Sequence, residues 1–239
     1  MSVRRIASPL PERLTVVALL ALTFATGVVD AVSVLVLGHV FVANMTGNAV
    51  FLGFLLIPDT GVDLTAAAVA VAGFLAGAVI GGRLVRHLCC QVRRWITVAL
   101  GGEAAVLLVL AVLAGAGVLR YDDDTKLILI AGLAVAFGLQ NSTARQFGIQ
   151  DLYTTVLTST IVGIGVDSRL AGGSGRREKL RYGVVLAMVA GAVVGATASR
   201  IAVAPVIGLA AGVVLVSLLI FRFGSAEVTN RRTPGAESN

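Results

Sequence analysis

The sequence predicts an all-α integral membrane protein with about six transmembrane helices, two short re-entrant or broken segments, and a weak inverted 3+3 repeat. Three observations lead to this fold class: the composition, the long apolar runs and the positions of the charges. Of the 239 residues, 57% are apolar and only 13% are charged, whereas soluble proteins average about half and a quarter. Backbone groups in lipid must be satisfied within the spanning segment, so the spans are expected to be helices.

Six apolar runs approach or exceed the ~20 residues that cross a bilayer as a helix. They are residues 14–29, 64–82, 95–119, 127–139, 182–199 and 201–221. The first run follows three arginines, as in a signal peptide, but it is too long and no clean cleavage site follows it. We therefore expect an uncleaved first helix.

Two shorter apolar segments, 41–57 and 152–166, are expected to enter and leave the membrane on the same side. Loops rich in Lys and Arg face the cytoplasm, and full crossing by 41–57 would turn the acidic loop 58–63 inward and the following arginine-rich loop outward. Re-entrant segments restore the pattern and place both termini in the cytoplasm. Eight full spans remain an alternative, because a short segment can cross a thin bilayer.

A weak internal duplication relates the two parts of the chain. GVVD at 27–30 lies over GLQN at an offset of 111 residues, TGN at 46–48 over TST at 112, and AGAVIG at 76–81 over AGAVVG at 114. An odd number of spans in each copy would insert the copies in opposite directions. The expected organisation is a cytoplasmic tail 1–13, repeats 14–119 and 120–223, and a cytoplasmic tail 224–239.

The segment FVANMTGN, residues 41–48, places Asn44, Thr46, Gly47 and Asn48 in an otherwise apolar stretch. Inverted repeats with paired interrupted helices are typical of secondary transporters, whose site lies near the midplane. Thr46 or Asn48 could cap a half-helix whose N-terminus favours an anion. Alternatively, these side chains only cap a kink and bond neighbouring helices.

Further polar residues complete the predicted site. Asp30 lies in the outer part of the first helix, where an ionisable group is a functional hypothesis by default, and we expect it to couple a proton or ion. Gln140 and Asn141 lie near the equivalent place in the second repeat, and Thr158 lies in the second short segment. Arg145 would bind an anion or pair with Asp30, or else extend to the headgroups.

Several classes of function are not expected. The basic residues lie in short loops, as insertion rules require, so nucleic acid is not an expected partner. The sequence has no catalytic or phosphate-binding motif, and no metal-ligand spacing, so neither an enzyme nor a cofactor is predicted. Close-packing GxxxG spacing at 73–77 and 77–81 indicates tight helix contacts or a homodimer face.

The strings GVVDA at 27–31, FVANMTGN at 41–48 and FGLQN at 137–141 together resemble the YoaK family of small bacterial membrane proteins, which carry a domain of unknown function. The resemblance covers about residues 14–223. It implies a bacterial plasma-membrane protein with about six spans, sometimes described as a permease, and it assigns no site residues.

These inferences converge on a small secondary transporter or permease in the lipid bilayer. Its solute would be small and anionic, would bind at the repeat interface, and would move with a proton on Asp30. Two other functions remain open: a non-transporting assembly partner or sensor, and a passive channel.

Overall fold

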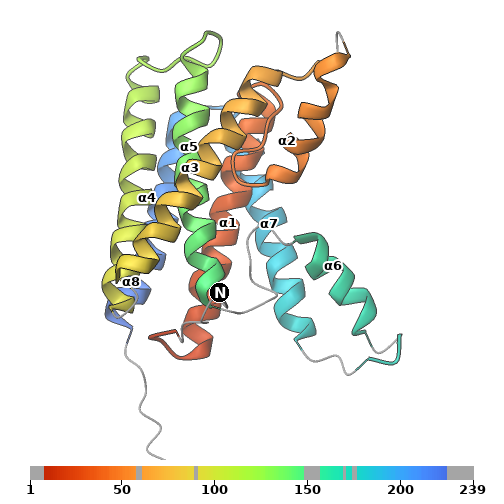
Figure 1. Ribbon diagram of the computed structural model, residues 1–239, viewed down its shortest axis with the longest axis vertical. Helices are drawn as coiled ribbons and strands as arrows, with labels where there is room; N and C mark the ends of the chain where they lie inside the picture. The colour runs from red at the N-terminus through yellow and green to blue at the C-terminus, as the bar shows by residue number, and fades with distance from the viewer. Residues whose placement is uncertain are drawn as a thin grey trace, which may run out of the picture.

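A computed structural model describes residues 8–57, 61–88, 91–147, 157–168, 171–173 and 177–224, and it confirms the all-α fold (Figure 1). Within these residues, six helices are long and apolar enough to cross a membrane. They are α1 (Glu12–Val36), α3 (Leu64–Leu88), α4 (Val92–Gly115), α5 (Lys126–Ala144), α7 (Glu178–Ala198) and α8 (Val203–Phe223).

Two short apolar helices accompany the six long ones. α2 (Met45–Leu52) continues into the 3-10 turn η1 (Gly53–Leu56), and α6 is Leu157–Val166. In Figure 1, α2 lies towards the upper end of the bundle and α6 towards the lower end. At 1.5 Å per residue, α2 with η1 is too short to cross a bilayer. Two short segments beside six spans are therefore confirmed, although residues 152–156 of the second lie outside the described residues.

Each short helix packs against the long helix that follows it: α2 against α3, and α6 against α7. Arg181 of α7 holds α6 in place, because its guanidinium donates to the carbonyl oxygen of Gly163 and pairs with Asp167, both at 2.5 Å. The end of α2 and η1 exposes a run of large apolar side chains, among them Leu55 and Leu56. Such a surface is suited to lipid rather than water.

The long helices pack in pairs that cross the division between the two repeats. The most extensive contacts join α3 to α5, α1 to α7 and α4 to α8, followed by α1 to α8 and α4 to α5. Exchanging α1–α4 with α5–α8 turns α3/α5 into α1/α7 and α1/α8 into α4/α5, and it leaves α4/α8 unchanged. The repeats therefore interlock, and this pairing supports the predicted duplication, whose exact bounds stay a prediction.

The equivalence of the repeats allows the bundle to be described as two matching units of four helices. The first unit contains α1, α6, α7 and α8, and the second contains α5, α2, α3 and α4. Between the units lie the α4/α8 contact and a smaller α1/α5 contact.

Glycines allow the close approach inside each unit. A Cβ added at Gly27 of α1 would overlap the carbonyl oxygen of Met188 in α7, and one at Gly138 of α5 would overlap that of Phe74 in α3. Gly138 follows Gly27 by 111 residues, and Met188 follows Phe74 by 114, which are the offsets of the sequence repeat. The two crossings are therefore equivalent to the level of single atoms, and the small-residue stripes serve packing within the chain.

Charges of opposite sign gather at opposite ends of the bundle. Arg93, at the start of α4, donates to the carbonyl oxygens of Arg222 at 3.0 Å and Gly224 at 2.9 Å, at the end of α8. The basic end also holds Arg83, Arg86, Arg94, Arg145, Arg177 and Arg181. The other end holds Asp63 and Asp122 to Asp124, with the cations Arg120, Lys126 and Arg200. This separation is the arrangement that insertion rules produce.

At the acidic end, Asp63 fixes the starts of α3 and α5 to each other. Its carboxylate lies 2.7 Å from Nζ of Lys126 and accepts the N–H of Ala66 at 2.9 Å. Partial burial acts to raise the pKa of Asp63, but the hydrogen bond and charge of Lys126 and the backbone N–H groups outweigh it and hold the pKa below its usual value.

The Asp63 pair predicts a pH-dependent contribution to stability. Because the fold favours the ionised carboxylate, the contribution is present above the usual aspartate pKa of about 4 and is lost as the pH falls through the lowered value. We expect Asp63→Asn to cost about 1 kcal/mol at neutral pH and clearly less at about pH 3. Thermal denaturation in detergent at both pH values checks this, with exposed Asp124→Asn as the control; an equal loss at both would contradict it.

Candidate functional site

The carboxylate of Asp30 holds the loop between α1 and α2. Its Oδ1 accepts the backbone N–H groups of Val42 at 3.0 Å and Ala43 at 2.9 Å, and its Oδ2 accepts Nδ2 of Asn44. Asp30 is 3% exposed, so the bonds form away from water. A carboxylate that accepts several N–H bonds is well satisfied in such a place.

Asn48 holds the same loop from the other side. Its side-chain oxygen accepts the N–H of Phe41 at 2.9 Å, and its Nδ2 donates to the carbonyl oxygen of the same residue at 2.5 Å. Asn48 is fully buried. A Cβ on Gly47 would lie 2.6 Å from Cε2 of the Phe41 ring, so glycine leaves room for that ring. The loop 41–44 with Asp30 and Asn48 is called the anchored loop below.

The anchored loop explains most of the polar residues in FVANMTGN. Irregular backbone at membrane depth needs internal partners, and here side chains supply them. The expectation that Thr46 or Asn48 caps α2 is wrong: the helix starts after Asn44, no side chain caps it, and Asn48 turns back to Phe41. Thr46 is exposed and contacts neither anchor. Asp30 already places a negative charge beside the start of α2, which removes the reason to expect an anion there.

Gln140 lies close to the anchored loop, but in a different contact. Its Nε2 donates to Oγ1 of Thr26 at 3.1 Å, which joins α5 to α1 one helical turn from Asp30. Asn141 is half-buried and donates to the carbonyl oxygen of Phe137 in its own helix at 2.9 Å. The structure thus brings Asp30, Asn44 and Asn48 together and places Gln140 next to them. The side chain of Asn141 instead bonds within its own helix.

Two predicted site residues lie away from this group. Thr158 is exposed on α6, at the other end of the bundle, and the buried member of that segment is Thr160, which is equivalent to Asn48 in the repeat. Arg145 is exposed just beyond α5. Of the alternatives for Arg145, the ion pair with Asp30 is wrong, because both carboxylate oxygens bond to the anchored loop and α5 ends at the opposite end of the bundle.

Sequence reasoning missed Glu103, which interrupts the apolar run 95–119 near its middle. Its side chain is fully buried, and neither carboxylate oxygen has a hydrogen-bond partner among the described residues. The signal was available, since an ionisable residue inside a span is itself a functional hypothesis.

Glu103 belongs to a buried polar layer that lies between the two units. Gly102 faces Leu139 across α4/α5, and Gly101 faces Leu218 across α4/α8. These contacts place Glu103 within about one turn of Gln140 on α5 and Ser217 on α8. The polar layer is defined here as Thr26, Glu103, Gln140 and Ser217, all buried.

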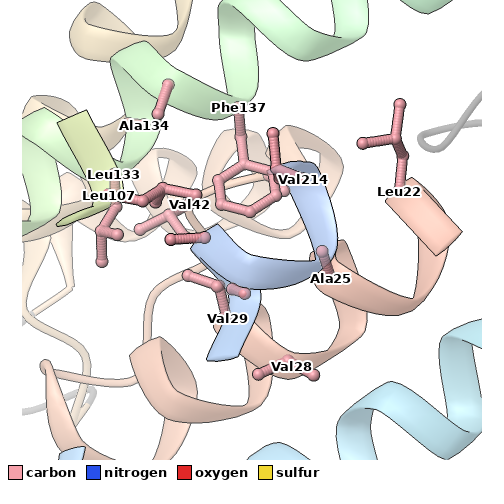
Figure 2. Packing of buried hydrophobic residues seen from close by; sticks show 14 of the residues in the cluster. Leu22, Ala25, Val28, Val29, Val42, Leu107, Leu133, Ala134, Phe137 and Val214 are labelled. Atoms are coloured by element: carbon pink, nitrogen blue, oxygen red, sulfur yellow. The ribbon is translucent and has the colours of Figure 1, made fainter. Parts of the chain in front are cut away.

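The polar layer is enclosed by apolar side chains from the same helices. Figure 2 shows Phe137, Leu107 and Val214, each one turn from a member of the layer on α5, α4 and α8. Ser217 donates to the carbonyl oxygen of Val213 in its own helix at 3.0 Å and approaches that of Ala18 in α1 at 3.3 Å. Four helices therefore contribute buried polar groups to the core, and these groups meet α1 over about two turns, from Ala18 to Thr26.

Comparison with known proteins identifies the family. A family described as "Protein of unknown function (DUF1275)" matches residues 18–220, most of the chain. The chain belongs to this family. It is also 35% identical over 156 residues to the UPF0700 transmembrane protein YoaK of Bacillus subtilis (strain 168), an alignment that covers 64% of this chain and 65% of that protein. The chain thus matches somewhat less than two thirds of the length of YoaK. No solved structure matches it.

The DUF1275 match encloses the anchored loop and the polar layer, so both lie inside the family's shared region. The name of the Bacillus relative describes a transmembrane protein, in agreement with the six spans. Among the described residues of this DUF1275 protein, no group of three or more His, Cys, Asp and Glu side chains could hold a metal ion. The groups that the polar layer offers are hydrogen-bonding: one carboxyl, one amide and two hydroxyls.

Proposed function

We propose that this DUF1275 protein is a small secondary transporter of the bacterial plasma membrane, in which the two four-helix units move relative to each other around the polar layer. The observation that carries the proposal is the arrangement itself: two equivalent, interlocked units with polar groups buried between them. Inverted repeats with short helices and a central site are characteristic of secondary transporters.

The packing suggests where movement occurs. Within each unit, glycines bring backbones into contact: Gly27 of α1 packs against α7, and Gly138 of α5 packs against α3. Such close packing makes each unit rigid. Between the units, the α1/α5 contact is small. The α4/α8 contact is extensive, but its glycines meet side chains and not backbone: Gly101 faces a Leu side chain at 3.9 Å, and Gly115 faces Cβ of Ala204 at 3.4 Å. Opening along this boundary would expose the polar layer first.

The residues of the layer favour a small solute that forms hydrogen bonds. Gln140 offers an amide oxygen without a partner among the described residues, and Thr26 and Ser217 offer hydroxyls. The layer contains no cationic side chain that could balance the charge of an anionic solute. We therefore place neutral solutes such as sugars, and zwitterionic solutes such as amino acids, ahead of anions. With the basic end in the cytoplasm, both chain termini face the cytoplasm.

The experiment is a thermal-shift screen of the purified protein against sugars, amino acids and small carboxylates, followed by uptake of each stabilising solute into proteoliposomes. Ligands that bind only the folded state raise its apparent stability. We expect at least one neutral or zwitterionic solute to raise the melting temperature and to enter with saturation. Gln140→Leu, which keeps the volume but removes the amide, should abolish both effects.

Two results would overturn the proposal. Uptake that rises in proportion to concentration would indicate a passive channel. If no solute stabilised the folded protein or was taken up, the result would favour the non-transporting class. One observation already supports that class: Asp30 and Asn48 form their hydrogen bonds with the backbone of the anchored loop.

A further inference from the structure

We propose that Glu103 is a proton-binding site in the centre of the bundle, which holds a proton when the units are packed together and shares it with the side-chain oxygen of Gln140. The bound species is a proton from water, which forms an O–H bond on one Glu103 oxygen. The inference rests on the proposed function only for its consequence, proton coupling. The binding itself is tested without transport.

The first step is the burial of the carboxyl group. Glu103 is 0% exposed in the middle of α4, and neither of its oxygens has a partner among the described residues. A carboxylate without a partner in a lipid-enclosed core is expensive, and such groups usually become neutral. Asp30 is the contrasting case, because three N–H groups from the anchored loop stabilise it.

The second step is the absence of a balancing cation nearby. α4 packs against α3, α5 and α8. The ionisable side chains on these helices are Arg83, Arg86 and His87 of α3, Lys126 of α5 and Arg222 of α8. Arg83 lies five residues before the end of α3, and the others lie in the first or last turns of their helices. Lys126 binds Asp63, and the remaining four are exposed. On α1, the charged group at this depth is Asp30, a second acid. A proton is therefore the charge that can neutralise Glu103.

The third step is the neighbouring acceptor. Gln140 uses its Nε2 to bind Thr26, and its oxygen has no partner among the described residues. The register of α4 and α5 puts Gln140 within about one helical turn of the level of Glu103. A protonated Glu103 would donate its O–H to the side-chain oxygen of Gln140, and this one hydrogen bond would give both groups a partner. A hard metal ion, in contrast, takes about six or more oxygens, which the layer does not gather.

The test is infrared spectroscopy of the whole protein in liposomes, where a protonated carboxyl gives a C=O band distinct from that of a carboxylate. At neutral pH we expect one protonated carboxyl band that is lost in Glu103→Gln and moved in frequency in Glu103→Asp. Asp30→Asn should keep the band. Gln140→Leu should shift the band to higher frequency without removing it, because the acid loses its acceptor.

Each other outcome counts against the inference. A band that survives Glu103→Gln, or is already missing in the parent protein, would show that Glu103 is ionised. Loss of the parent band on adding sodium chloride at fixed pH would assign a sodium ion instead of a proton. Were the band lost with Glu103→Gln while no solute is transported, the proton site would stand and the proposed function would fall.

Discussion

Replacing Asp30 with Ala is expected to lower the melting temperature of the protein by about 10 °C. The substitution leaves the N–H groups of Val42 and Ala43 buried without an acceptor, at about 1–3 kcal/mol for each orphaned group. A loss of about 3 kcal/mol corresponds to that shift for a chain of this size. Asn48→Ala should act in the same direction, because it frees both backbone groups of Phe41.

Two control variants sharpen the Asp30 experiment. Thr46→Ala changes an exposed residue of the same segment, so it should leave the melting temperature within about 1 °C of the parent. Asp30→Asn keeps one acceptor oxygen and should fall between the parent and Asp30→Ala. Thermal denaturation in detergent, followed by circular dichroism, measures all four variants. If Asp30→Ala melted with the parent, the anchored loop would not be a source of stability.

Introducing Val at Gly77 or Gly191 is expected to separate α3 from α5 or α1 from α7. A Cβ at Gly77 would overlap the carbonyl oxygen of Val135, and one at Gly191 would overlap that of Phe24. Backbone cannot move aside as a flexible side chain can, so each substitution should cost about 3 kcal/mol, at the upper end of overpacking effects. Because the repeat makes the two contacts equivalent, the two losses should be similar.

The control for the glycine variants is Gly212→Val in α8, where an added Cβ meets nothing within 4 Å. It should cost less than about 1 kcal/mol, because the substitution changes only the helix propensity, which differs little between Gly and Val. Melting temperature and the yield of folded protein on gel filtration report all three. A large effect at Gly77 with none at Gly191 would contradict the equivalence of the two crossings.

The fold could be predicted largely from composition and charge. Span length is set by bilayer thickness, and the basic loops order the spans, so the short segments at 41–57 and 152–166 could be recognised before any contact was known. The repeat offsets also pointed to the two glycine crossings. The partners of each helix could not be predicted, because a repeat specifies equivalence between helices but not which of them touch.

The site was predicted less well. Asp30, Asn44 and Asn48 do lie together, but their partners are backbone groups of residues 41–43, which no side-chain pattern reveals. In the second repeat, the choice between Thr158 and Thr160 depends on the face that α6 turns towards the bundle. Glu103 was the opposite case. An acidic residue inside an apolar span is a signal that the sequence alone contains, but it was missed because the run 95–119 was read only as a transmembrane segment.

The most direct test of the account is a reversible cross-link between the two units. A Cβ on Gly115 of α4 would lie 3.4 Å from Cβ of Ala204 in α8, close to the spacing of a disulfide. The double variant Gly115→Cys with Ala204→Cys, made without the native cysteines, should lose saturable uptake of the stabilising solute when oxidised and regain it when reduced. Uptake that continues unchanged in fully cross-linked protein would contradict the claim that the units move apart.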